Sequence, residues 1–424
     1  MKKHKKIFSA AVLCLLLSGC SRTNLSAPDF ISNVSAAVET SEAKASAEAV
    51  DTVESAGNNA SSQETAAFEE AVQTAEQGSH PAGEDEENGK LTTRAREILA
   101  GMTVEEKAGQ VVIGRYPGAN APEEALKYRL CGYVMFAADF ENSTPEDIRE
   151  NISAIQNGAK VKMLFAADEE GGNVVRISKF PQYREESFPS QREVFSSGGA
   201  EGVFEDAAEK SRLLGSLGLN MNLAPVCDLP RSDSDYIADR AFGTDAGNAE
   251  SAAASAVAGY QSEGLICTLK HFPGYGNNVD THAGISIDKR PLSELEELDL
   301  RPFLAGMSEG APVVMVSHNI VECVDDSLPG SLSPKMYAYL RETGFDGVAM
   351  TDDLSMQGVG EYCGEEQAAV TAFNAGADLL CCTDYASAVS ALTEAANSGG
   401  ISVEKLNGSA EKILVMKLKY GIIS

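Results

Sequence analysis

Tryptophan is absent from this sequence of 424 residues, and histidine, cysteine and positively charged residues are scarce. Lysine and arginine number 34 against 63 aspartates and glutamates, which gives a formal net charge of −29. This deficit argues against nucleic acid as a partner, because binding to phosphates depends on clustered basic side chains. Nine cysteines are too few for a small scaffold held by disulfides, so a hydrophobic core must hold the fold.

The N-terminus has no apolar run long enough to span a membrane as a helix. Its basic start is followed by an apolar run over residues 7–17, whereas a spanning helix needs roughly 20 residues. This pattern predicts an export signal over residues 1–20. The ending LSGC resembles the bacterial lipoprotein signal, in which the cysteine receives a lipid after cleavage. The resemblance implies a protein anchored through Cys20 to the cell membrane on its extracytoplasmic side, and the alternative is a soluble secreted protein.

Residues 21–90 are rich in Ala, Ser, Glu, Gln and Thr and have almost no aromatic residues. Apolar residues recur there with neither the helical period of 3.6 nor the strand period of 2. So little apolar surface cannot offset the entropy that ordering the backbone would cost. We therefore expect a disordered acidic linker over residues 21–90 and a folded region over residues 91–424.

The folded region contains eight short apolar runs, bounded by turn residues and separated by segments with helical periodicity. Strands that alternate with helices pair in parallel through right-handed crossovers. Eight such repeats predict an α/β fold of the (β/α)8 TIM-type barrel class, with an open doubly wound sheet as the alternative. The runs are 110–114, 132–137, 163–167, 221–225, 266–270, 313–317, 347–351 and 378–382. The helical segments include 145–157, 205–217, 247–264, 291–309, 333–343, 365–375, 385–397 and 403–419.

Polar side chains suited to catalysis or binding follow six of the eight runs, at the point where each run ends. Active sites of (β/α)8 barrels lie at the C-terminal ends of the strands, so these residues are expected to meet. The segments that contain them are Asp168 to Gly172, Val226 to Asp228, His271 to Gly274, His318 and Asn319, Asp352 and Asp353, and Thr383 and Asp384.

The most specific segment is KHFPGYGNNVDTH over residues 270–282, in which proline and glycine exclude a helix and require a shaped loop. Asp280 precedes His282 by two residues and can accept a hydrogen bond from one imidazole nitrogen while the other nitrogen faces a substrate. These residues predict a proton-transfer pair, in which His282 is the general acid/base and Asp280 orients it. A carboxylate nucleophile is then expected elsewhere on the barrel rim.

The segment 270–282 resembles the signature of glycoside hydrolase family 3 β-N-acetylglucosaminidases, which reads KH-F/I-PG-H/L-G and, a few residues later, D-S/T-H. Two positions depart from that pattern. Tyr275 stands where His or Leu is usual, and Asn277-Asn278 stand where Asp-Thr is usual. Tyr275 is expected to reshape the loop or to contact the sugar. Four further blocks resemble those of the family in the same order, namely DEEGGNVVR at 168–176, LNMNLAPVCD at 219–228, DRAFG at 239–243 and TDDLSM at 351–356.

The resemblance implies that Asp352, the first aspartate of the TDDLSM block, is the nucleophile, and that His282 assisted by Asp280 is the acid/base. The enzyme would be a retaining exo-β-N-acetylglucosaminidase that forms a covalent glycosyl-enzyme. Its substrates would carry terminal β-linked N-acetylglucosamine, as cell-wall muropeptides and chitin fragments do. Asp353 is expected to be structural, because neighbouring positions at a strand end point in different directions. The sugar-binding positions implied by the resemblance are Asp168, Arg176, Arg240, Lys270 and His271.

Two other functions remain open on the same scaffold. A phosphorylase would use phosphate instead of water to remove the sugar from Asp352, and a sugar-binding lipoprotein would lack turnover. No metal-ligand spacing occurs in the sequence, and glycoside hydrolysis requires neither a metal nor a cofactor. The two resemblances together imply a glycan and the membrane as partners.

Overall fold

The computed structural model describes residues 82–278, 284, 286–360 and 362–424. Cys20, the signal segment and the catalytic candidates Asp280 and His282 lie outside the described residues. The chain divides into two compact units, Met1–Lys90 and Leu91–Ser424. None of the helices in the described part of the chain is long and apolar enough to cross a membrane.

Helix α4 spans Ala82–Ala100 and therefore includes residues 82–90, for which we predicted disorder. For these residues the prediction was wrong. Several acidic residues stand near the start of the helix, where the helix dipole favours negative charge, and Lys90 lies 2.7 Å from Glu86 one turn earlier. The low apolar content of the segment concealed this local helix signal.

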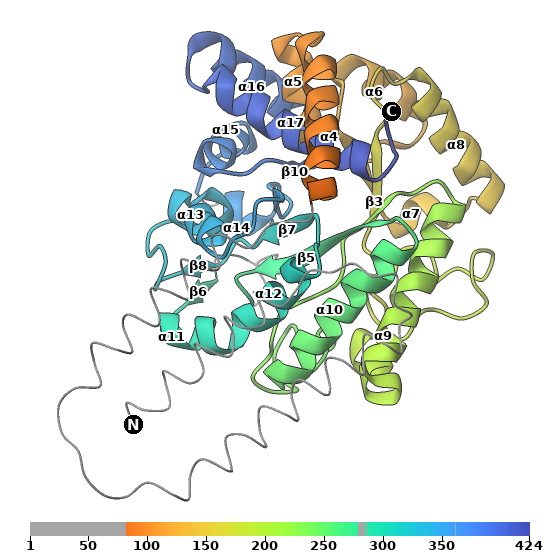
Figure 1. Cartoon of the computed structure of the whole chain (residues 1–424), viewed down its shortest axis with the longest axis vertical. Coiled ribbons are helices and arrows are strands. Elements are labelled where there is room, and N and C mark those ends of the chain that lie inside the picture. The colour runs from red at the N-terminus through yellow and green to blue at the C-terminus, as the bar shows by residue number, and fades with distance from the viewer. Residues whose placement is uncertain (1–81, 279–283, 285, 361) are drawn as a thin grey trace, which may run out of the picture. The chain divides into compact units, whose positions relative to one another are not determined.

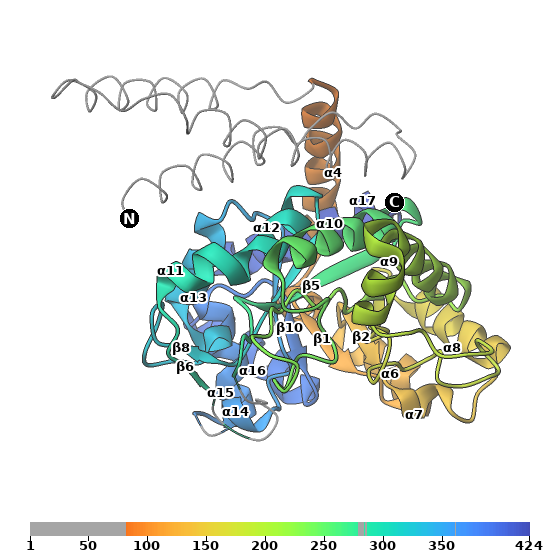
Figure 2. The same cartoon turned by 90° about the horizontal axis from the view of Figure 1, so that it is seen from below.

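Eight parallel strands form the predicted barrel (Figures 1 and 2). Each of the eight apolar runs overlaps one strand, so the predicted fold class is confirmed. The sheet runs in the order β10-β1-β2-β3-β4-β5-β7-β9, and a parallel bridge between Met350 and Leu379 links its two ends. The strands are β1 (Val112–Arg115), β2 (Gly132–Met135), β3 (Leu164–Ala167), β4 (Met221–Asn222), β5 (Ile266–Phe272), β7 (Val313–Val316), β9 (Val348–Thr351) and β10 (Leu380–Cys382).

Helices connect the strands and surround them (Figure 2), and local sequence signals set where many of them begin. Thr103, Thr144 and Ser190 each form a capping box with an acidic residue three positions later. The helical elements after α4 are α5 (Val104–Gln110), η1 (Gly118–Asn120), α6 (Ala121–Tyr128), α7 (Ala137–Phe140), α8 (Pro145–Gly158), α9 (Gln191–Ser216), α10 (Ala246–Ser262), α11 (Leu292–Glu294), η3 (Leu295–Asp299), α12 (Leu300–Ser308), η4 (Gly330–Leu332), α13 (Pro334–Glu342), α14 (Gln357–Gly360), α15 (Glu365–Ala375), α16 (Tyr385–Ser398) and α17 (Val403–Lys419).

The barrel strands are buried on both faces, as all-parallel sheets covered by helices are. β2, β3, β5, β7 and β9 have no exposed residue. One small element was not predicted, a parallel pair of two-residue strands, β6 (Ile287–Asp288) and β8 (Ile320–Val321). Cys227, Cys267, Cys381 and Cys382 are buried, and the seven cysteines of the described region form no disulfide.

Candidate active site

A pocket of about 680 Å³ opens where the barrel strands end. Its walls include Phe136 after β2, Asp168 after β3, Asp352 after β9 and Thr383 after β10. The pocket therefore lies at the C-terminal face, where the barrel class places its active sites. Polar residues that follow four of the predicted strands are brought together there, although they are far apart in the sequence. They are Asp168, Glu170, His271, Asp352, Asp353 and Thr383.

The loop after β3 is shaped by Glu169, a buried carboxylate that accepts hydrogen bonds from the backbone of the same loop. Glu169 accepts hydrogen bonds from the N–H groups of Arg176 and Ile177, each at 2.8 Å, and from that of Ser178 at 3.1 Å. Gly171 adopts a φ of +104°, and a Cβ at this position would lie 2.0 Å from the Pro189 carbonyl oxygen. Only glycine fits this turn. The loop thereby turns Asp168 and Glu170 toward the pocket.

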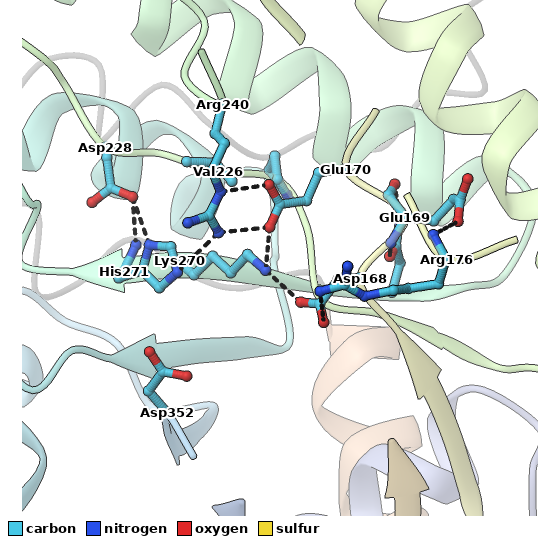
Figure 3. Close-up of polar contacts among 12 residues, drawn as sticks. Asp168, Glu169, Glu170, Arg176, Val226, Asp228, Arg240, Lys270, His271 and Asp352 are labelled. Atoms are coloured by element: carbon cyan, nitrogen blue, oxygen red, sulfur yellow. Dashed lines mark hydrogen bonds and ion pairs between the residues drawn. The ribbon is translucent and has the colours of Figure 1, made fainter. Parts of the chain in front are cut away.

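Four charged residues form a network along one side of the pocket (Figure 3), which we call the pocket network. The Lys270 Nζ lies 2.7 Å from Asp168 Oδ1 and 2.6 Å from Glu170 Oε1. Arg240 holds Glu170 with two hydrogen bonds of 2.9 and 2.8 Å. Such charge-assisted pairs are strong and directional. The network therefore holds Asp168, Glu170, Arg240 and Lys270 in one defined arrangement.

Burial and ion pairing act in opposite directions on these groups. Burial alone would raise the pKa of Glu170, but Lys270 and Arg240 outweigh it and hold that pKa well below its usual range. Burial would likewise lower the pKa of Lys270, yet Asp168 and Glu170 raise it. All four groups of the pocket network are therefore charged at neutral pH. Their charges largely cancel, since two are acidic and two are basic.

His271 is oriented by Asp228, which lies in the loop that follows β4. The imidazole Nδ1 lies 2.7 Å from Asp228 Oδ2, and the second oxygen of that carboxylate accepts from the N–H of Tyr275 at 2.8 Å. Because a carboxylate only accepts, Nδ1 carries the hydrogen and Nε2 is left to face Arg240 Nη2 at 3.4 Å. Asp228 thus fixes both the orientation of the His271 ring and the position of Tyr275 at the start of the following loop.

Asp352 lies across the site from Glu170 and Arg240, and its carboxylate is directed toward His271 and Lys270 (Figure 3). Burial would raise its pKa, but the nearby His318, His271 and Lys270 outweigh burial and lower the pKa from the usual value. The carboxylate is therefore ionised at neutral pH. An ionised carboxylate in a partly enclosed pocket is suited to act as a nucleophile.

Asp353 has a different environment from its neighbour. Its two carboxylate oxygens accept hydrogen bonds from the Ser355 N–H at 3.0 Å and the Thr383 hydroxyl at 2.8 Å. The His318 Nε2 donates to its carbonyl oxygen at 2.9 Å. Asp353 thus ties the loop after β9 to the loop after β10 and fixes the backbone next to Asp352.

Six of the eight predicted catalytic and sugar-binding residues lie together at this pocket. Lys270 reaches it through its ion pair with Asp168, and the other five line its wall. Arg176 pairs with Asp168 at 3.3 Å, and its buried Nε has no hydrogen-bond partner in the described structure. The remaining two, Asp280 and His282, lie outside the described residues. The six residues are Asp168, Arg176, Arg240, Lys270, His271 and Asp352.

Sequence reasoning missed Glu170 and Asp228 as site residues and left Tyr275 undecided. Glu170 and Asp228 follow predicted strands closely, so their place at the C-terminal ends of the strands could be predicted. Their pairing with Arg240, Lys270 and His271 could not. Tyr275 is only 2% exposed, and its ring packs edge-on against His271 at 5.2 Å and against Val226 and Ile237. It does not line the pocket, and its ring supports the loop.

Comparisons with known proteins agree with this geometry. The model of the glycosyl hydrolase family 3 N-terminal domain matches residues 103–416. A β-hexosaminidase of Pseudomonas aeruginosa is 35% identical over 271 residues, which are 62% of this chain and 77% of that protein. The solved family 3 β-N-acetylglucosaminidase from a Paenibacillus strain superposes with a TM-score of 0.71 at 30% identity, over 76% of this chain and 63% of that one. A family 3 glycosyl hydrolase of Mycobacterium smegmatis superposes with a TM-score of 0.69 at 28% identity, over 75% of this chain and 98% of that one.

Proposed function

This chain belongs to glycosyl hydrolase family 3, and from that premise we propose that it is a retaining, exo-acting β-N-acetylglucosaminidase. It is a glycoside hydrolase of the β-N-acetylhexosaminidase type, as its relatives are. The observation that carries the mechanistic proposal is Asp352, an ionised carboxylate directed into a pocket whose opposite side is a fixed charge network. Among the described residues, Asp352 has no arginine or lysine ion pair within 4.0 Å, whereas the pocket carboxylates Asp168 and Glu170 are both held in such pairs.

The proposed reaction proceeds in two displacements. The Asp352 carboxylate attacks the anomeric carbon of the terminal sugar while the bond to the leaving oxygen breaks, and His282 gives that oxygen its proton. Water then loses a proton to His282 and attacks the same carbon, which releases the sugar and restores Asp352. Asp280 would orient the imidazole. A histidine in this role avoids the like-charge repulsion that a second carboxylate would bring.

The pocket network would bind the sugar. Asp168, Lys270 and Arg240 present acceptors and donors that are already held in place, so little entropy is lost when sugar hydroxyls replace water. Arg176, which lines the pocket and pairs with Asp168, would add a guanidinium to the same site. The His271 Nε2 completes the set. We propose that the bound group is the terminal N-acetylglucosamine of a muropeptide or a chitin-type fragment.

Two substrates test the proposal directly. The purified protein should hydrolyse 4-nitrophenyl β-N-acetylglucosaminide and leave the matching β-glucoside nearly untouched. The assay with and without phosphate distinguishes the products, because free N-acetylglucosamine indicates hydrolysis and its 1-phosphate indicates a phosphorylase. A 5-fluoro derivative of the sugar should accumulate as a covalent adduct, and peptide mass spectrometry should find it on Asp352. An adduct on another residue would overturn the assignment of the nucleophile.

We also propose that lipid on Cys20 anchors the protein to the extracytoplasmic side of the cell membrane, with residues 21–81 between the anchor and α4. The support is the LSGC sequence after an apolar run too short to remain in a bilayer. Cys20→Ala should move the full-length protein from the membrane fraction to the soluble fraction without changing its activity on the aryl substrate. Retention of the variant in the membrane would contradict lipid anchoring.

A further inference from the structure

An exposed tyrosine stands at the mouth of the catalytic pocket. Tyr236 is 39% exposed and lines the same pocket as Asp352 and His271. Asn173 and Asp239 are also exposed and line the pocket, and Asn173 Nδ2 lies 3.5 Å from Asp239 Oδ2. We call these three residues, Asn173, Tyr236 and Asp239, the mouth cluster. An aromatic face with an amide and a carboxylate beside it offers what a pyranose ring needs, an apolar surface for its C–H face and partners for its hydroxyls.

The tyrosine ring is held in place. Its ring centre lies 5.9 Å from that of Tyr275, which is buried and packs in turn on His271. The turn that carries it is closed by Asp235, whose carboxylate accepts from the N–H groups of Arg231 and Ser232 at 2.6 and 2.8 Å. The next residue, Ile237, is fully buried. A surface that is ordered before binding costs less entropy when a ligand arrives.

The position of the mouth cluster relates it to the leaving group. Tyr236 contacts Tyr275, which belongs to the segment 270–282 that carries the proposed acid/base His282. The acid/base must reach the oxygen between the cleaved sugar and its leaving group. The pocket network binds the cleaved sugar with charged side chains, whereas the mouth cluster is more exposed and carries a single charge. The pocket network and the mouth cluster therefore suit different parts of the substrate.

We propose that the mouth cluster is a binding site for the leaving group, and that this leaving group is a second pyranose sugar that stacks on Tyr236. This inference rests on the proposed glycosidase function and adds to it the residues that bind the leaving group. A glycan substrate then gains affinity from Tyr236 that a simple alkyl glycoside cannot gain.

The test compares two substrates that share the cleaved sugar and differ in the leaving group, N,N′-diacetylchitobiose and methyl β-N-acetylglucosaminide. Released N-acetylglucosamine is measured for both. Tyr236→Ala should lower kcat/KM for the disaccharide about tenfold, in the range of one lost aromatic contact, and change it less than about twofold for the methyl glycoside. Tyr236→Phe keeps the ring and should retain most of the preference for the disaccharide.

Tyr362→Ala is the matched control, because Tyr362 is 38% exposed and does not line the pocket. It should leave both substrates unaffected. If Tyr236→Ala folds poorly, Asn173→Ala probes the same cluster from a different loop and should weaken the disaccharide selectively. Equal changes for both substrates, or no change for either, would overturn the leaving-group site. A wild-type enzyme that cleaves neither substrate would instead refute the proposed glycosidase function.

Discussion

Two buried ionic networks in this barrel use the same residue types for different ends. The pocket network, Asp168, Glu170, Arg240 and Lys270, borders the catalytic pocket. The second network, which we call the anchor network, lies beside the base of the segment 270–282, and none of its residues lines the pocket. Asp288 and Asp299 are fully buried there. The anchor network consists of Arg231, Asp288, Arg290 and Asp299.

The hydrogen bonds of Arg290 in the anchor network go to acceptors within the protein. Its Nε binds Asp288 Oδ1 at 2.9 Å, its Nη1 binds Asp299 Oδ1 at 2.6 Å, and its Nη2 donates to the Gly274 carbonyl at 2.7 Å. A Cβ on Gly276 would lie 2.2 Å from Nη1, so the chain passes directly over the guanidinium. Each nitrogen of this guanidinium donates to a protein acceptor.

The pocket network differs because three of its members, Asp168, Glu170 and Arg240, line a pocket that opens to solvent. The His271 Nε2 is also directed to the pocket side. Residue type alone therefore does not distinguish a binding site from a structural anchor. The distinction lies in whether the charged groups line a pocket that a ligand can enter.

The largest expected effect concerns Asp352, which the pocket network faces. Asp352→Asn removes the nucleophile and should lower kcat on the aryl substrate by roughly 10⁴-fold, while the melting temperature stays close to that of the wild type. Asp353→Asn, at the adjacent position, should cost much less activity because Asp353 holds two loops rather than the substrate. Comparable losses in the two variants would place the chemistry elsewhere.

The next effect separates the two networks through matched arginine substitutions. Arg290→Met leaves two buried aspartates short of a partner and should lower the free energy of unfolding by about 3–5 kcal/mol. Arg240→Met should cost less stability, since Lys270 still neutralises Glu170 beside a hydrated pocket, and more activity. Urea unfolding and kcat/KM measured on both variants make the comparison. If both lost stability and activity in the same proportion, the two networks would not differ in function.

Acid stability gives a smaller effect that is specific to the pocket network. The pKa of Glu170 is lower in the folded protein than its usual value of 4.5, so its contribution to stability is complete above pH 4.5 and is lost as the pH falls below that value toward the folded pKa. The melting temperatures of the wild type and Glu170→Gln should therefore differ most near neutrality and converge in acid. Glu263→Gln, which disrupts a surface pair with Arg212, should show no such convergence.

The smallest effect is a shift in the pH profile of activity. His318 lies outside the pocket lining and lowers the pKa of Asp352. His318→Gln should therefore raise that pKa, and because the nucleophile must be ionised, kcat/KM should begin to fall at a higher pH than in the wild type. Ser331→Ala removes the hydroxyl 2.7 Å from His318 Nδ1 but keeps the imidazole, and should shift the profile less. An unchanged acid limb in His318→Gln would remove His318 from the electrostatics of Asp352.

Much of the fold could be predicted because parallel barrel strands are continuous apolar runs, such as Val313–Val316, flanked by periodic helices. The pair β6–β8 escaped prediction because two-residue strands such as Ile287–Asp288 leave no pattern. Helix α4 escaped because a mainly polar helix lacks an apolar stripe. In the site, Asp352 and Lys270 were identified by the resemblance of their sequence blocks to those of the family, whereas the role of Asp228 depends on a contact with His271, 43 residues later in the chain.

The sequence by itself determined the alternation of strands and helices, and with it the end of the barrel at which polar residues gather. These properties follow from apolar periodicity and turn residues, which act over a few neighbouring positions. Only the tertiary structure decided which charges pair, why Tyr275 is buried while Tyr236 is exposed, and why the pKa of Asp352 is lowered. The reason is physical, since burial and Coulomb interactions depend on distances between residues that the chain separates by tens of positions and the fold brings within a few ångströms.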